Sequence, residues 1–200
     1  MVRVSLLFGL LVLLFTPVYA DPLHDAAKAG DLERVQQLVD GGANLDVPLQ
    51  RGETPLIVAA LAGHTEVAEL LIARGATVQA RNDRGFTALH AAVYRGHLAV
   101  VELLIANDVN VNDAENRFRA TPLHLAAEDD RKDVAEFLVD KGADLEAKEG
   151  NGYTPLTKAG FREHWETARL LIDRGAVCQP VSAVGEWWHN ECTKGEWLQD

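Results

Sequence analysis

Apolar residues recur in pairs of short segments along most of this chain. In each pair the second segment carries large apolar residues at helical spacing, which predicts an amphipathic helix with one buried face. The first segment instead carries adjacent alanines, at residues 59–60, 91–92 and 126–127, where neighbouring helices can approach closely. The pattern therefore predicts consecutive packed pairs of helices. The large apolar residues of three second segments are Val67, Leu70 and Leu71; Val100, Leu103 and Leu104; and Val134, Phe137 and Leu138.

A short motif gives these pairs a period close to 33 residues. Thr-Pro-Leu at residues 54–56 recurs at 121–123 and 154–156, as Thr-Ala-Leu at 87–89 and, more weakly, as Asp-Pro-Leu at 21–23. The steps between the middle residues are 33, 33, 34 and 33, a regularity that indicates a stacked repeat protein. We expect the additional residue of the fourth unit in a loop between Asn112 and Thr121.

Residues that begin and end helices stand at the same places in each unit. Threonine can cap the first helix, and the following proline costs no hydrogen bond there. Glycine permits the left-handed backbone of the turn between the helices and after the second helix. These glycines are Gly30, Gly63 and Gly96, and Gly42, Gly75, Gly142 and Gly175. Acidic residues replace glycine at three such places, which we expect to be less favourable: Asp108, Asp130 and Glu163.

Residues 121–127, Thr-Pro-Leu-His-Leu-Ala-Ala, resemble the T-P-L-H-x-A signature of ankyrin repeats in full. Residues 87–92 match it with alanine in place of proline, whereas Ile57 and Thr157 depart from it at the histidine. The resemblance covers roughly residues 21–179. It implies an all-α ankyrin-repeat solenoid of about five helix pairs, with β-hairpin fingers at the junctions. It also implies recognition of other proteins as the usual role, with no catalytic residues to carry over.

The five repeats are expected at about residues 21–48, 49–81, 82–115, 116–148 and 149–179. A solenoid needs a polar face on each terminal repeat, and Arg34 and Gln37 supply one in the first. The last repeat keeps apolar residues on that face, so we expect a C-terminal tail, residues 180–200, to cover it. The tail carries three of the four tryptophans: Trp187, Trp188 and Trp197.

Residues 1–20 have the pattern of a cleavable signal peptide. Arg3 precedes an apolar run at residues 6–15, and small residues precede a cut between Ala20 and Asp21. The run is too short to span about 30 Å of hydrocarbon, although an uncleaved anchor is the alternative. We therefore expect an exported protein, periplasmic or secreted. Resemblance to bacterial ankyrin-repeat proteins with signal peptides favours the periplasm, and the signal does not separate bacterial from eukaryotic export.

Export decides how the two cysteines are interpreted. In an oxidising compartment Cys178 and Cys192 are predicted to form a disulfide that folds the tail onto the last helix pair. A flexible tail with two free thiols is the alternative. Together with His189 the cysteines offer a His-x-x-Cys spacing for zinc or copper, but no second pair of ligands completes such a site. We therefore expect no metal.

Charge and motif content exclude further classes of function. The chain has 19 basic and 30 acidic residues, a net charge of −11, which gives no basic excess for coating nucleic acid. No P-loop, zinc-protease or dinucleotide-binding motif occurs, and six of the seven histidines fall at repeat positions. We therefore expect a protein that is not an enzyme and has no cofactor.

In ankyrin-like stacks the finger tips and the outer turns of the first helices line a concave surface, and here these positions collect arginines and aromatic residues. Such residues often anchor interfaces, so we expect a protein partner with an acidic or mixed patch. The alternative is that these are ordinary solvated positions. The residues are Arg51, Glu53, Arg84, Phe86, Tyr94, Arg95, Arg117, Phe118, Arg119, Tyr153, Phe161 and Arg162.

The sequence therefore predicts a monomeric, exported interaction module that binds, and restrains or stabilises, another protein. One alternative is a secreted effector or toxin that binds a host protein through the same surface. A metal-binding or enzymatic role of the tail is the other.

Overall fold

The computed structural model describes residues 21–49 and 51–195. The predicted signal peptide and Trp197 lie outside these residues. Within the described part of the chain there are eleven helices and no strand. The first helices of the pairs are α1 (Pro22–Ala29), α3 (Pro55–Ala62), α5 (Ala88–Arg95), α7 (Pro122–Glu128) and α9 (Pro155–Phe161). The second helices are α2 (Leu32–Asp40), α4 (Thr65–Ala73), α6 (Leu98–Ala106), α8 (Lys132–Asp140) and α10 (Trp165–Asp173), and α11 (Val181–Lys194) follows them.

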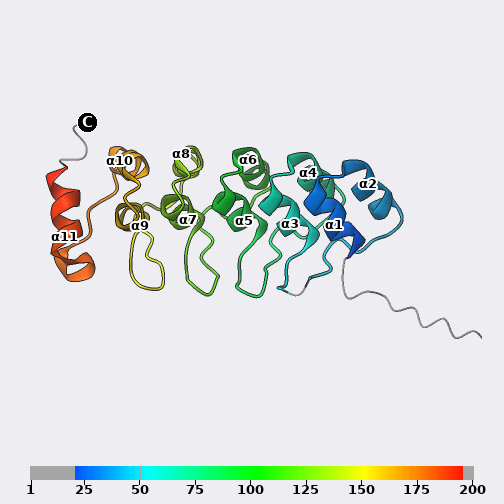
Figure 1. The fold of residues 1–200 in the computed structure, drawn as a ribbon, viewed down its shortest axis with the longest axis horizontal. Coiled ribbons are helices and arrows are strands. Elements are labelled where there is room, and N and C mark those ends of the chain that lie inside the picture. The colour runs from blue at the N-terminus through cyan, green and yellow to red at the C-terminus, as the bar shows by residue number, and fades with distance from the viewer. Residues whose placement is uncertain (1–20, 50, 196–200) are drawn as a thin grey trace, which may run out of the picture.

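Figure 1 shows these helices as an elongated stack in two rows, with α11 closing one end. The first helices form one row, the second helices form the other, and long loops extend away from the first row as fingers. The predicted all-α solenoid is confirmed. The expected β-hairpins are not assigned as strands in the described residues, and tight turns close the fingers. In the finger at residues 82–86, for example, Asn82 N donates to Phe86 O and Gly85 N donates to Asn82 O.

Histidines of the T-P-L-H motif join each helix pair to the next finger. The His124 ring accepts a hydrogen bond at Nδ1 from Thr121 N, at 3.2 Å. Its Nε2–H donates to Tyr153 O in the following repeat, at 2.9 Å. His90 and His24 make the corresponding bonds to Ala120 O and Glu53 O, and His90 Nε2 also lies 3.1 Å from Asp113 O. The structural role that we expect for these histidines therefore consists of holding neighbouring repeats in register.

The left-handed turns follow the glycines and their acidic replacements. Asp108, Asp130 and Glu163 all have positive φ, between 53° and 60°, as the sequence predicts. A fourth residue, Arg119, has φ 54° in the finger turn that other repeats build with glycine. A side chain in this conformation costs roughly 1 kcal/mol or more, so Arg119 is a position where the chain tolerates strain.

Hydrogen bonds locate the additional residue of the fourth repeat. Asp113 N donates to Asn110 O as Ala80 N does to Thr77 O, which keeps the spacing of 33 up to that point. The next turn bond runs from Arg119 N to Asn116 O, and the equivalent one in the preceding finger from Gly85 N to Asn82 O. The spacing is then 34, so the residue is inserted between Asp113 and Asn116. The Asp113 carboxylate is buried there and pairs with Arg81, at 2.8 Å.

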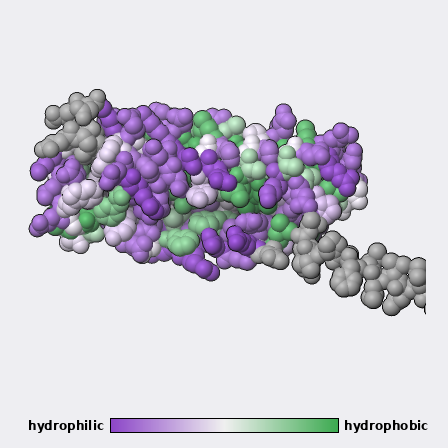
Figure 2. All heavy atoms as spheres, in the orientation of Figure 1, coloured by the Kyte–Doolittle hydropathy of each residue, from purple (hydrophilic) through white to green (hydrophobic). Residues whose placement is uncertain are grey.

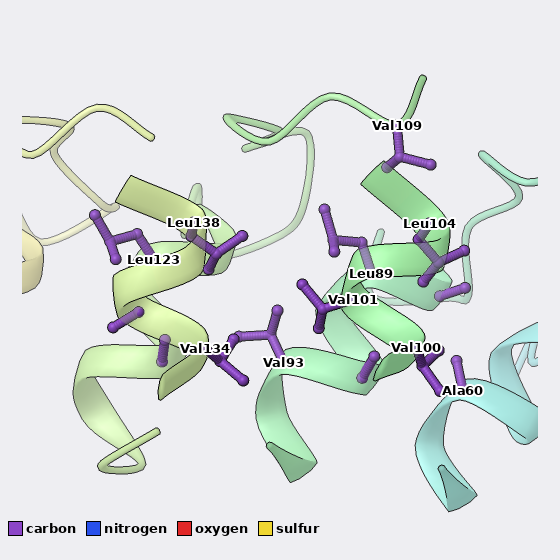
Figure 3. Close-up of a cluster of buried hydrophobic side chains, with 14 of the residues drawn as sticks. Ala60, Leu89, Val93, Val100, Val101, Leu104, Val109, Leu123, Val134 and Leu138 are labelled. Atoms are coloured by element: carbon purple, nitrogen blue, oxygen red, sulfur yellow. The ribbon is translucent and has the colours of Figure 1, made fainter. Parts of the chain in front are cut away.

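The core is a continuous layer between the two rows of helices. Figure 3 shows side chains from successive repeats meeting there, among them Leu89, Leu104, Leu123 and Leu138, each fully buried. Ala60, Ala92 and Ala127 of the first helices are fully buried as well, because their small side chains let neighbouring first helices pack closely. No single pair encloses its own apolar face, so each repeat completes the core of its neighbour.

The two ends of the stack are closed differently. Arg34 and Gln37 are exposed on α2, as expected for a solvated end. At the other end α11 packs on α9, and the Trp188 side chain is 0% exposed. It fits over Gly160, because a Cβ atom at that position would lie 1.9 Å from the indole ring.

Two further contacts hold α11 in place. Cys178 and Cys192 form the disulfide that the sequence predicts. The neighbouring Gln179 is buried, and its amide accepts from Thr154 N at 3.0 Å and donates to Gly152 O at 2.9 Å. In the last repeat Gln179 thus bonds the finger and the start of α9, and it accepts from Thr154 N as the His124 ring does from Thr121 N.

We predict that Gly160→Ala destabilises the protein by about 1–3 kcal/mol, because the added methyl group overpacks against Trp188. In a Trp188→Ala background the same change should stabilise by about 0.5–1 kcal/mol, since alanine is the better helix residue. Urea unfolding of the four proteins of this cycle measures both effects. Destabilisation of equal size in the two backgrounds would contradict the packing of Trp188 on Gly160.

We predict that stability falls as the pH drops below about 6.5. Burial lowers the pKa of His90 and of His124 beneath the ordinary imidazole value of about 6.5. The folded protein then binds fewer protons than the unfolded chain between these pKa values and about pH 6.5. The contribution of the two histidines to the free energy of unfolding is therefore fully present above about pH 6.5 and is lost as the pH falls toward the lowered pKa values. Urea midpoints at about pH 7.5 and 5.5 measure this decrease. His90→Gln/His124→Gln should show a smaller decrease than the parent, and an equal one would contradict the assignment.

Candidate interaction surface

The twelve residues predicted to bind a partner lie on the fingers and at the C-terminal ends of α5 and α9. Nine of them are exposed and three, Glu53, Phe86 and Tyr153, are half-buried. Tyr94 and Phe118 are each 47% exposed, which is high for large aromatic side chains. Figure 2 shows hydrophobic residues lying among hydrophilic ones in the middle of the stack.

Two hollows lie beside these residues, across α5, α7 and the neighbouring fingers. The larger has a volume of about 480 Å³ and is lined by four of the twelve residues: Arg84, Phe86, Tyr94 and Arg162. The smaller, of about 320 Å³, is lined by Phe86 and Phe118. The other seven predicted residues, Arg51, Glu53, Arg95, Arg117, Arg119, Tyr153 and Phe161, line neither hollow.

Phe86 forms the wall shared by both hollows. Its ring stacks on Phe118 of the next finger, with centroids 5.8 Å apart and an interplanar angle of 18°. It also contacts the His90 ring at 5.3 Å, so a histidine that joins two repeats supports it from behind. The two phenylalanines are thus part of one aromatic surface rather than isolated exposed residues.

An ion cluster forms the floor where the two hollows meet. Glu128 pairs with Lys158 at 2.8 Å and with Arg162 at 2.7 Å. Partial burial would raise the pKa of Glu128, but hydrogen bonds from Arg162 and Lys158 lower it below the usual range. Burial and the charge of Glu128 raise the pKa of the adjacent Asp129. The floor therefore carries both signs of charge, and the Arg162 guanidinium is already held by a carboxylate.

Repeat alignment could have revealed the origin of the larger hollow, which the sequence prediction missed. One position of the first helix carries Val58, Ala91, Leu125 and Lys158 in successive repeats. Ala91 is by far the smallest of these, and together with Leu61 and Leu125 it lines the hollow. A small residue between larger ones leaves this space, and the surrounding backbone continues unchanged.

The C-terminal end of the surface is connected to α11 through aromatic rings. Tyr153 contacts Phe161 edge-on at 5.2 Å, and Phe161 contacts Trp188 at 6.3 Å. Phe161 therefore lies against Trp188 and Tyr153 lies against Phe161, and neither predicted residue lines a hollow.

Neither a cluster of potential metal ligands nor a membrane-spanning helix is found in residues 21–49 and 51–195. No group of three or more His, Cys, Asp or Glu side chains is arranged to hold a metal ion there. The disulfide engages both Cys178 and Cys192, and the His189 Nδ1–H donates to Gln179 O at 2.9 Å. None of the helices in this part of the chain combines the length and apolar character needed to cross a lipid bilayer.

Comparison with known proteins gives matches that each cover only part of this chain and part of the other protein. Transient receptor potential cation channel subfamily A member 1 of Drosophila melanogaster is 38% identical over 66 residues, 33% of this chain and 6% of that protein. Alpha-latrocrustotoxin-Lt1a of Latrodectus tredecimguttatus is 38% identical over 98 residues, 42% of this chain and 7% of that protein. A putative ankyrin repeat protein of Rickettsia felis is 38% identical over 69 residues, 34% of this chain and 30% of that protein.

This chain therefore spans no more than 30% of the length of these relatives. The family model described as ankyrin repeats (3 copies) matches residues 23–115 and 107–181. Ankyrin repeats are protein–protein interaction modules and generally not catalytic. Because the two matches cover most of the chain and the helix pairs repeat through the same region, the chain belongs to the ankyrin-repeat family.

Proposed function

We propose that this protein is an exported interaction module that binds another protein through its concave face and restrains or stabilises it. The observation that carries the proposal is the pair of adjoining hollows, separated by Phe86 and bordered by exposed Tyr94 and Phe118. Ligand sites commonly combine such apolar walls with a few charged groups. Bulky aromatic side chains with arginines nearby are also the residues that dominate binding energy at interfaces.

The structure of the stack suits a restraining role. Histidine bonds between repeats and the closely packed first helices fix the fingers relative to one another. A surface that is already ordered loses little conformational entropy on docking, so its contacts contribute more fully to affinity.

Two features support export. Residues 1–20 have the pattern of a signal peptide, and the disulfide between Cys178 and Cys192 is of a type that persists in oxidising compartments. Together these two features support a periplasmic or secreted setting. The same surface would serve an effector that binds a host protein, and the origin of the captured partner separates the two roles.

We predict that Phe86→Ala/Phe118→Ala abolishes capture of a partner from the native exported fraction, because it removes the shared wall of both hollows. Affinity capture followed by mass spectrometry compares the variant with the parent. The matched control is Leu32→Ala/Val177→Ala, which removes two exposed apolar side chains far from the hollows and should retain the partner. Undiminished capture by the phenylalanine variant, with its thermal stability unchanged, would remove the concave face from the proposal.

We also predict that the protein isolated from its native source begins at Asp21 and contains no free thiol. Intact-mass measurement with and without reduction tests both points, because reduction of one disulfide adds two hydrogen atoms. A chain that retains residues 1–20, or two alkylatable thiols in the unreduced protein, would contradict the exported setting.

A further inference from the structure

Most arginines that contact a carboxylate in this structure lie away from the finger tips. Arg74, Arg81 and Arg174 each pair with acidic side chains of a neighbouring repeat, and Arg162 pairs with Glu128. The exposed arginines of the fingers are different, and besides Arg51 there are three of them on two adjacent fingers. The side chains of Arg84, Arg117 and Arg119 are exposed and make no ion pair within the described residues, although acidic residues outnumber basic ones 30 to 19.

These three arginines, which we call the arginine rim, belong to two adjacent fingers. Arg117 N donates to Arg84 O at 2.9 Å, which holds the two tips together. The stacked rings of Phe86 and Phe118 come from the same two fingers, so the rim borders the aromatic wall. Arg119 has a left-handed φ of 54°, so an arginine stands there despite its conformational cost.

Two carboxylates of the same two fingers are directed elsewhere. Glu115 is held by Arg81, at 3.2 Å. The backbone of Asp83 bonds to Arg51 O, and its carboxylate lies against Gly52 in the preceding finger. The positive charge of the rim is therefore left for a group from outside the chain.

The larger hollow adjoins this rim at Arg84. Its volume of about 480 Å³ lies within the range of small-ligand sites, and it exists because Ala91 stands where Leu125 and Val58 stand in the neighbouring repeats. Leu61, Leu125 and Phe86 provide apolar walls, which suit the side chain of a large apolar residue.

We propose that this face binds an extended acidic segment of the partner protein that carries one large apolar side chain. The apolar side chain occupies the hollow beside Ala91, and carboxylates on either side pair with Arg84, Arg117 and Arg119. This inference rests on the proposed function and adds the chemistry of the partner. Arginine suits the role because its planar guanidinium binds a carboxylate through two hydrogen bonds.

The experiment uses the exported protein with its disulfide intact and a fluorescein-labelled peptide, Gly-Asp-Glu-Asp-Leu-Glu-Asp-Glu-Gly, in fluorescence anisotropy titrations. A second peptide replaces Leu with Ser, a third replaces every acidic residue with Lys, and a single-stranded oligonucleotide tests phosphate as the anion. The parent should bind the first peptide most tightly. Binding should weaken as salt is raised, because exposed charges are screened within about 10 Å at 0.1 M salt.

Two variants separate the two parts of the proposed contact. Arg84→Gln/Arg117→Gln/Arg119→Gln should weaken binding about tenfold or more. A control with the same change of net charge, Arg34→Gln/Lys141→Gln/Arg169→Gln, alters the second helices and their ends and should change affinity less than about twofold. Ala91→Leu reproduces the residue of the next repeat and fills the hollow. It should weaken binding of the Leu peptide but not of the Ser peptide.

Equal affinity of the parent and the rim variant would overturn the proposal, provided that thermal unfolding shows both to be folded. Tighter binding of the Lys peptide or of the oligonucleotide would overturn it as well, as would no binding of the acidic peptide by the parent. If a native partner is still captured through Phe86 and Phe118 in these cases, the proposed function stands and only the partner chemistry is wrong. If no native partner depends on those residues, the proposed function fails whatever the peptide result.

Discussion

Stacking of one helix pair on the next is the interaction on which this structure depends. Its repeat helices have only seven to nine residues, too short to be stable alone in water. They persist because each repeat buries the apolar face of its neighbour, and leucines such as Leu89 and Leu123 are fully buried between repeats. Histidine rings fix the register of this stacking. His124 accepts from its own helix start and donates to the next finger, so a single side chain determines where a finger lies relative to the core.

The same dependence explains the ends of the molecule. A repeat without a neighbour leaves one face uncovered, and the first repeat meets this with polar residues whereas the last is covered by α11. There the Gln179 amide accepts from Thr154 N, as a histidine ring does at the start of α7, and Trp188 fills the space over Gly160. Because Phe161 lies between Trp188 and Tyr153, the packing of α11 also supports the C-terminal edge of the concave face. The end of the stack and the proposed binding face are therefore physically connected.

On the face that carries the fingers, the backbone repeats from one unit to the next and the side chains differ. Stacking places the same position of successive repeats in a row, so one small residue among larger ones leaves a hollow, as Ala91 does between Val58 and Leu125. Charges are distributed in the same way. Glu128 holds Arg162 and Lys158 across neighbouring repeats, and the finger tips present Arg84, Arg117 and Arg119 to solvent. The stacked helices make this face rigid, and the side chains that differ between repeats determine which partner it can select.

Much of this architecture was determined by the sequence alone. The period of 33, the capping residues and the left-handed turns at Asp108, Asp130 and Glu163 follow from local backbone chemistry, which acts within a few residues and can be derived from a single repeat. The pairing of Cys178 with Cys192 followed from their number. Only the tertiary structure decided that Trp188 docks on Gly160, that Gln179 replaces a histidine, and which predicted surface residues gather around the hollows. These depend on distances between residues of different repeats, and a sequence gives the order of side chains but not the space that a missing methyl group leaves between them.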